Sequence, residues 1–213
     1  LSLVGSEMCI RDSAEAEFTY RLANTEELKW LETISQNKSR IIEFRSMAKF
    51  VEEGTNERAL TQVKAVDNEY PLIGNVQLVS GKSFKDVFRQ PKSAVMESDL
   101  ASRLGINIGE TFSLGLTKFV LRDIIQSSPD DAGTNFGFGP RTIVKSEDLL
   151  DSGLIAPGTL FTAKYRLLIE PFENLDKLRA LAKIKFENNG MRWRDARNGA
   201  PGISEFVLSL IHI

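Results

Sequence analysis

Apolar and polar residues alternate near the start of the chain, in AEFTYRL (residues 16–22), where Phe18 and Tyr20 share one face. A period of two residues predicts a half-buried strand. Three further stretches are rich in β-branched and aromatic residues and are bounded by the turn-forming segments EEGTNE and NEYPLIG. They are predicted as strands, at residues 39–50, 59–66 and 75–79.

The segment between the first two predicted strands has helical spacing instead. In TEELKWLETISQ (residues 25–36) apolar residues recur every three or four positions, which predicts an amphipathic helix. Asn24 or Thr25 is expected to cap it, and Glu26 and Glu27 favour the positive end of the helix dipole. Its apolar positions are Leu28, Trp30, Leu31 and Ile34.

The middle of the chain, about residues 91–156, changes to short elements with many glycines. Ser98 is expected to cap a helix in DLASRL, and Gly105 to end it in a left-handed conformation. TFSLG and KFVLRDII indicate a β-hairpin with the turn GLT. Ser146 is expected to cap EDLLDSG in the same way, with Gly153 at its end. These short elements indicate a small β-rich subdomain.

The last third repeats the opening pattern, with TAKYRLLIE as a strand and residues 174–189 as a helix. Asn174 is expected to cap this helix and Gly190 to end it. One stripe of the helix carries Leu175, Leu178, Leu181, Ala182 and Phe186. The sequence therefore predicts an α+β fold, in which two β-α-β halves flank an inserted small β-rich subdomain. Trp30 and Phe186, one on each long helix, are predicted to be buried contacts within that unit.

The composition is that of an ordinary globular protein, with 42% hydrophobic and 26% charged residues and a formal net charge of -2. The near balance of charges, without a block of five like charges, argues against nucleic acid as a partner. No stretch approaches the roughly 20 apolar residues of a membrane helix, and no signal peptide is recognisable.

Both ends of the chain look foreign to the rest. LSLVGSEMCIRDS (residues 1–13) and LSLIHI (208–213) resemble translated sequencing-adapter read-through at the ends of metagenomic contigs, so the chain is interpreted as a fragment. They contain Cys9 and His212, the only cysteine and the only histidine. Without them, no disulfide, zinc site or Ser-His-Asp or Cys-His arrangement is available. We therefore expect no catalytic residue, no cofactor, no metal and no enzymatic activity.

Other chemical readings of the sequence are weaker than structural ones. Asp67 with Glu69, or Asp130 with Asp131, are possible acid/base or calcium-binding pairs, but their polar turn setting favours solvated loop residues. LGINIGETFSLG follows a helix and precedes a strand, the reverse of a phosphate-binding loop, which favours turn glycines. Around Trp193, the segment RWR offers a cation-π patch for lipid headgroups or, as the favoured interpretation, an edge strand with a packed indole.

One loop contains the strongest candidates for a binding contact. SSPDDAGTNFGFGPR combines glycines with Phe136 and Phe138, which are candidates for contacting a lipid-like cargo or a partner protein. The alternative, which we favour, is that both rings pack into the β-rich subdomain.

Four segments carry a family resemblance through their combination and order: QVKAVDNEYPLIGNVQL (residues 62–78), LASRLGINIGETFSLG (100–115), FGFGPRTIV (136–144) and GLIAPGTLFTAKYRLLI (153–169). Together they resemble the extracytoplasmic domain of FtsX/MacB-like ABC transporter permeases of the YbbP type, over about residues 14–206. None of the four is a catalytic motif.

The resemblance implies a layout, a location and a partner. It implies a porter-like subdomain from residues 14–90 and 161–195, a distal β-rich subdomain at 91–160, and the start of a stalk at 196–207. It also implies a periplasmic domain of an inner-membrane permease that works with a LolD-like ATPase on a lipophilic substrate. A free-standing periplasmic binding protein and, last, a carboxylate-dependent hydrolase remain as alternatives. Flanking membrane helices in the parent gene would distinguish the first two.

Overall fold

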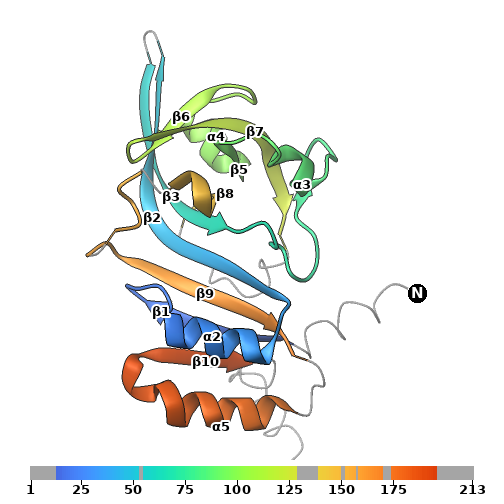
Figure 1. Ribbon diagram of the computed structural model, residues 1–213. Helices are drawn as coiled ribbons and strands as arrows, with labels where there is room; N and C mark the ends of the chain where they lie inside the picture. The colour runs from blue at the N-terminus through green and yellow to red at the C-terminus, as the bar shows by residue number, and fades with distance from the viewer. Residues whose placement is uncertain are drawn as a thin grey trace, which may run out of the picture.

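The computed structural model of the chain describes residues 13–52, 55–128, 139–149, 152–156, 158–169 and 174–195. Within these residues, ten strands form one sheet in the order β10-β1-β9-β2-β3-β8-β5-β7-β4, and β6 pairs with both β2 and β7 (Figure 1). The strands are β1 Ser13–Thr19, β2 Lys38–Glu52, β3 Thr55–Val66, β4 Gln77–Leu78, β5 Ser93–Glu97, β6 Thr111–Leu114, β7 Thr117–Ser127, β8 Arg141–Lys145, β9 Phe161–Leu168 and β10 Met191–Asp195. The helices are α2 Thr25–Ile34, α3 Phe84–Val87, α4 Ser98–Leu104 and α5 Leu175–Phe186, with 3-10 turns at Ser146–Leu149 and Glu187–Asn189.

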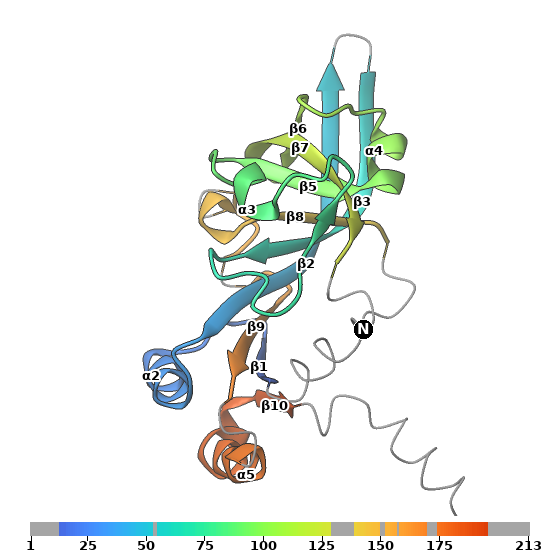
Figure 2. The same ribbon diagram turned by 90° about the vertical axis from the view of Figure 1, so that its right-hand side faces the viewer.

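One end of the molecule is a half-sheet made of β10, β1, β9 and the first half of β2, with every strand antiparallel to its neighbour. α2 and α5 lie together on one face of this half-sheet (Figure 2). The strand residues that face the helices are apolar and buried, among them Ala16, Phe18, Ala163 and Tyr165. The mixed architecture agrees with the predicted α+β class.

Both long helices form where their sequences predict. α2 starts with a capping box, in which the Asn24 side chain accepts the backbone N–H of Glu27 and the Glu27 carboxylate accepts the backbone N–H of Asn24. Asn24, not Thr25, is thus the cap. α5 buries Leu175, Ala182 and Phe186 against the half-sheet. A 3-10 turn follows α5 and ends at Gly190, whose positive φ of 74 suits glycine.

At the other end of the molecule, the strands close on themselves. β2 pairs with β3, and the order continues through β8, β5 and β7 to β6, which returns to Ala48 and Lys49 of β2. The ring β2-β3-β8-β5-β7-β6 is therefore a small closed barrel. Two of its pairings, β3 with β8 and β5 with β7, are parallel. α4 contacts β3 and β5 and contributes Leu100 and Leu104, both fully buried, to the interior.

The long strand β2 belongs to both ends. Residues 38–44 pair with β9 in the half-sheet, whereas Ala48 and Lys49 pair with β6 in the barrel. One face of β2 contributes Ile42, Phe44, Ala48 and Phe50 to a single apolar core that extends from beneath the helices into the barrel. Since successive side chains of a strand point to opposite faces, this continuity follows from the alternation in its sequence.

A second, smaller core covers the outside of the barrel. The segment that contains β4 and α3 packs Tyr70, Phe84 and Phe88 over Val95 and Ile143 of the barrel strands. The Tyr70–Phe84 and Phe84–Phe88 ring centroids are 5.8 and 4.6 Å apart. The Tyr70–Pro71 peptide bond is cis.

Several local expectations need correction. β1 ends at Thr19, and Tyr20 takes a left-handed φ of 64 with 61% of its surface exposed, so Tyr20 does not share the buried face of Phe18. Ser98 is the first helical residue of α4, because the cap position is Glu97, which pairs with Arg141 instead of capping. Ser146 begins a 3-10 turn.

The ends of the described chain lie side by side. Ala14, near the start of β1, pairs with Asp195, the last residue of β10. β1 begins at Ser13, the last residue of the segment predicted to be foreign. The foreign origin of residues 1–13 and 208–213 stays a prediction, since residues 1–12 and 196–213 lie outside the described ranges.

Candidate functional site

The carboxylates considered as a possible site do not converge. Asp67 follows β3 and accepts hydrogen bonds from the hydroxyl of Ser39, at 2.9 Å, and from the backbone N–H of Arg40 on the neighbouring strand. Glu69 is exposed, and it contacts Asp67 through its backbone N–H, which donates to the Asp67 carboxylate at 3.2 Å. Asp67 therefore holds two strands together, and Glu69 is a solvated loop residue. Asp130 and Asp131 lie outside the described residues.

Among the described residues, no group of three or more His, Cys, Asp and Glu side chains is placed to hold a metal ion. The same part of the chain contains no helix that is long and apolar enough to span a membrane. Gly105, Gly109 and Gly115 all have positive φ, between 57 and 99, and lie in turns. This confirms that they are turn glycines.

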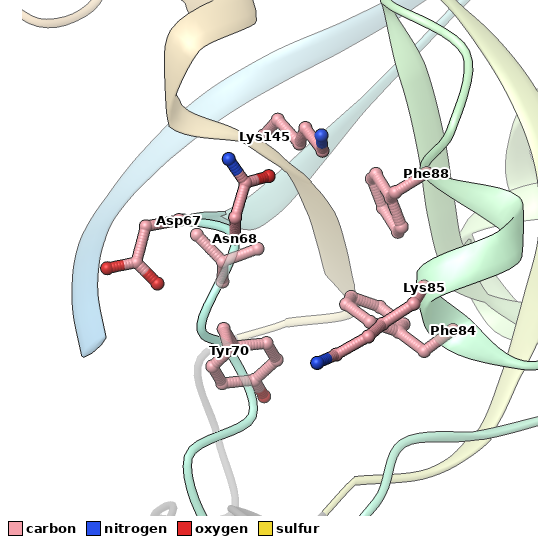
Figure 3. A pocket seen from close by; sticks show the side chains of 8 residues that line it. Asp67, Asn68, Tyr70, Phe84, Lys85, Phe88 and Lys145 are labelled. Carbon is pink, nitrogen blue, oxygen red and sulfur yellow. The ribbon is translucent and has the colours of Figure 1, made fainter. Parts of the chain in front are cut away.

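A pocket of about 140 Å³ lies where the outer core meets the end of β3 (Figure 3). Its wall is formed by Val66, Asp67, Asn68, Tyr70, Phe84, Lys85, Phe88 and Lys145. The Asp67 carboxylate points away from the aromatic rings, and the lysine ammonium groups come from opposite sides (Figure 3). The volume is below the roughly 300 Å³ at which small-molecule sites begin. The pocket therefore offers neither an acid/base pair nor space for a cofactor.

The most developed contact network lies in the helix layer. Trp30 of α2 meets Phe186 of α5 with ring centroids 5.1 Å apart and planes at 63°, an edge-to-face geometry. Trp30 also meets Trp193 of β10, at 5.7 Å. Phe186 is buried and Trp30 is half-buried. The predicted burial is thus confirmed for Phe186 and only in part for Trp30, and the favoured interpretation of the RWR segment, an edge strand with a packed indole, is confirmed. We call these three residues the aromatic cluster.

Two double hydrogen-bonded ion pairs fix the same layer. Arg21, after β1, donates to both carboxylate oxygens of Glu27 in α2, at 2.7 and 2.8 Å, and to the carbonyl of Asn189 beyond α5. Arg179 of α5 donates to both oxygens of Asp195 at the end of β10, at 2.9 and 2.6 Å. The side chains of Glu27 and Asp195 have no exposed surface. The first pair holds the start of α2 against the end of β1, and the second holds α5 against β10; the long-range link is the bond from Arg21 to the carbonyl of Asn189, 168 residues away.

Burial alone would raise the pKa of Glu27, because a charged carboxylate loses solvation. Hydrogen bonds from Arg21 and from the backbone of Asn24 outweigh burial, so the pKa of Glu27 lies below its ordinary value. The Glu27 carboxylate is therefore charged at neutral pH and serves the structure rather than proton transfer.

The face of the half-sheet opposite the helices is charged. On this face, basic side chains on β10, β9 and β3 alternate with acidic side chains on β1 and β2. We call these charged side chains the charge ladder. Its contacts range from 2.7 Å, between Lys164 and Glu43, to 3.7 Å, between Lys64 and Glu43. Its members are Arg192, Arg194, Glu15, Glu17, Lys164, Arg166, Glu43 and Lys64.

Burial lowers the pKa of Lys164, because a charged lysine loses solvation. The nearby carboxylates of Glu43 and Glu15 raise the pKa by more than burial lowers it, so it lies above its ordinary value. The lysine therefore stays charged at neutral pH. The charge ladder was not predicted from the sequence. The signal was present in the pairs of like charges two residues apart on β1, β9 and β10, but the strand register that brings opposite signs together is not visible in the sequence.

Phe136 and Phe138, the candidate contacts for a lipid-like cargo or a partner, lie outside the described residues, so their role stays a prediction. The described residues instead form a continuous packed unit. The two helices contact each other on the half-sheet, and the core beneath them continues along β2 into the closed barrel.

Comparison with known proteins identifies the family. The model of the MacB-like periplasmic core domain matches residues 8–180. The uncharacterized ABC transporter permease YbbP of Escherichia coli (strain K12) is 30% identical over 108 residues, which cover 50% of this chain but only 13% of that permease. The chain thus spans a small part of that relative's length.

Two solved structures share the fold. The extracellular domain of the noncanonic ABC-type transporter YknZ from Gram-positive bacteria superposes with a TM-score of 0.57 at 13% identity, covering 86% of this chain and 99% of that one. The periplasmic region of MacB from Actinobacillus actinomycetemcomitans gives 0.56 at 10% identity, covering 99% and 98%. With the family model matching most of its length, the chain belongs to the family of MacB-like periplasmic core domains.

Proposed function

We propose that this chain is the extracytoplasmic domain of an ABC transporter permease subunit. In this proposal it is not catalytic, and it couples ATP-driven motion in the membrane to the export or extraction of a lipophilic substrate. Its family membership and its similarity to a permease support the first part. The absence of converging acid/base groups among the described residues is compatible with the second part.

The observation that carries the proposal is that the first and last strands of the described fold are neighbours. Ala14 and Asp195 are paired residues of neighbouring strands, so the described fold begins and ends at one place. This arrangement suits a domain looped out between two successive membrane segments, because both connections must return to the same membrane. In a full-length permease, residues 196–207 would begin the stalk toward the second segment.

The coupling path in this proposal follows β2. In this proposal the porter-like subdomain, predicted from residues 14–90 and 161–195, places its helix-packed half-sheet next to the membrane. Residues 91–160 form most of the distal subdomain, which the second half of β2 and β3 complete as strands of the barrel. Displacement of the half-sheet is passed on because β2 is one continuous strand whose buried face serves the cores of both parts. Close-packed interiors transmit strain rather than absorb it.

We further propose that the partner is a LolD-like ATPase at the cytoplasmic side and that the domain lies in the periplasm of an inner-membrane protein. The test begins with the parent gene, in which an apolar stretch of about 20 residues should flank the domain on each side. A cysteine placed at exposed Leu160 of the full-length permease should react with a membrane-impermeant maleimide from the periplasm. The ATPase should co-purify with the permease.

Two outcomes would contradict the proposal. A parent gene without flanking membrane segments would favour a free-standing periplasmic binding protein. Reproducible hydrolysis of an ester, peptide or glycoside by the chain, lost on changing one of its carboxylates, would favour the hydrolase alternative.

A further inference from the structure

The outer side of α5 is unusual for a surface helix, because it carries large apolar side chains away from the core. Ile184 is 83% exposed and Leu181 is 52% exposed. Together with Lys177 they are spaced by four and three residues, so they lie on one side of the helix. The opposite side holds Leu175, Ala182 and Phe186, which are buried against the half-sheet. α5 is therefore apolar on two sides.

Lysines surround this apolar pair. Lys177 precedes Leu181 by four residues on the same side of the helix, and Lys183 and Lys185 flank Ile184 in the sequence, all three lysines being exposed. Lys185 also contacts Glu26 at 3.6 Å, in a pair that is exposed at both ends and therefore weak. The acidic residue of the first turn, Asp176, contacts Arg179 of the same helix at 3.7 Å. The outer side of α5 thus combines two apolar side chains with a positive rim.

α5 lies at the end of the molecule where the described fold begins and ends. α5 is the element farthest from the barrel in both views, and β10 runs beside it (Figures 1 and 2). β10 ends at Asp195, which is tied to α5 through Arg179 and paired with Ala14 of β1. Both connections out of the described fold therefore leave next to α5, and 18 residues of the chain follow Asp195.

We propose that the outer surface of α5, formed by Lys177, Leu181, Lys183, Ile184 and Lys185, docks on a bilayer surface that contains anionic phospholipid. This inference rests on the proposed function, which makes the two adjacent connections lead into a membrane. Helices that lie in the membrane interface combine an apolar strip with flanking lysines, and each lysine near an anionic surface adds attraction.

The size of the surface argues against a folded protein as its occupant. Stable protein interfaces bury about 800 Å² on each partner, with a central cluster of apolar or aromatic residues. Two apolar side chains on one short helix are too few for that. They are enough for a shallow contact with lipid that needs little affinity, because the membrane connections would already hold the domain at the bilayer.

The chain contains two internal comparisons. The neighbouring helix α2 exposes Glu26, Lys29 and Glu32 but no large apolar residue. The outer face of the β2–β3 hairpin exposes the paired residues Met47 and Leu60 among basic neighbours, so its composition resembles that of α5. The hairpin extends to the opposite end of the molecule from β10 and α5 (Figure 1). Of the three surfaces compared, only that of α5 combines the composition with the position.

The test is co-sedimentation of the 213-residue chain with vesicles of phosphatidylcholine alone or with one third phosphatidylglycerol. We expect binding only to the anionic vesicles, weakened by salt. L181S/I184S should lower the partition coefficient about tenfold, because two apolar side chains no longer enter the interface. K177Q/K185Q should lower it about fivefold per lysine. M47S/L60S, the matched control, should bind like the unchanged chain. Circular dichroism and the urea midpoint show that each variant is folded.

Equal binding to both kinds of vesicle, or no binding at all, would overturn the proposal. So would loss of binding in M47S/L60S, which would place the lipid contact on the hairpin. A dimer of the chain that becomes a monomer in L181S/I184S would show that α5 meets a second copy instead. If the chain does not bind vesicles, the docking proposal is wrong but the proposed function is not affected. If the parent gene encodes no flanking membrane segments, the proposed function is wrong even when the chain binds vesicles.

Discussion

Replacing Phe186 by alanine tests the contact that joins the two long helices. Phe186 is 1% exposed and meets Trp30 edge to face. Truncating a fully buried phenylalanine costs about 3–5 kcal/mol, because apolar contact is lost and a cavity is left. Trp30 is half-buried, so Trp30→Ala should cost about 3 kcal/mol, the lower end of the same range. An edge-to-face pair adds about 0.5–1.5 kcal/mol beyond area burial.

The double variant W30A/F186A should therefore be less destabilised than the sum of the single variants, by about 0.5–1.5 kcal/mol. The free energies of unfolding are measured by urea titration with far-UV circular dichroism, since tryptophan fluorescence changes with Trp30 itself. Near-UV circular dichroism must give the same transitions for the two-state analysis to hold. Leu181→Ala, on the exposed side of α5, serves as the control and should stay within about 0.5 kcal/mol of the unchanged chain.

Strict additivity of the two substitutions would show that the rings do not interact in solution. A cost below about 1 kcal/mol for Phe186→Ala would show that α5 is not packed against the half-sheet as described. Either result would also remove the helix layer from the proposed coupling path.

Three further predictions concern electrostatics and turns. The pKa of Glu27 in the folded chain lies below its value in the unfolded chain. The charged carboxylate therefore contributes fully to stability above about pH 4.5, and this contribution is lost as the pH falls through the folded pKa. Urea titrations at a series of pH values should show this loss in the unchanged chain and not in Glu27→Gln. Glu43→Gln removes an ion-pair partner of half-buried Lys164 and of buried Lys64, which should lower the pKa of Lys164 in an NMR titration and cost about 3 kcal/mol of unfolding free energy in urea. Gly115→Ala should cost more than Gly105→Ala in thermal unfolding, because both positions have positive φ but only at Gly115 would a Cβ meet a backbone oxygen, at 2.6 Å.

Much of the fold was predictable because its signals are local. The capping box at Asn24 and the helical spacing after it define α2, and the alternation in β1 and β9 predicts the half-sheet. The closure of the barrel was not predictable, because it depends on the pairing of β6 with Ala48 and Lys49, more than 60 residues earlier in the chain. Tyr20 was misplaced because the strand pattern gives no sign of the left-handed turn that ends β1.

The candidate site follows the same division. The burial of Phe186 was predictable, since it lies on the apolar stripe of an amphipathic helix, but its contact with Trp30 depends on how α2 and α5 are placed on the half-sheet. The sequence predicted that Asp67 lies in a polar turn. It did not predict that the Asp67 carboxylate accepts hydrogen bonds from Ser39 and Arg40, because these residues lie on a neighbouring strand. The charge ladder was missed for the same reason, as its partners meet only once the strands are assembled. The ion pair between Arg21 and Glu27, six residues apart, was missed because Arg21 was predicted to continue the first strand, which ends at Thr19.

The most direct test of the account is a complementation assay with the full-length permease and its ATPase, with transport measured per amount of folded permease in the membrane. If the domain transmits motion through its packing, W30A and F186A should impair transport while the ATPase still binds at the cytoplasmic side. The amide substitutions D67N, E69Q, D130N and D131N should leave transport nearly intact. The reverse ranking, with tolerated aromatic truncations and an amide substitution that abolishes transport, would contradict force transmission and show that a polar binding or catalytic site carries the function.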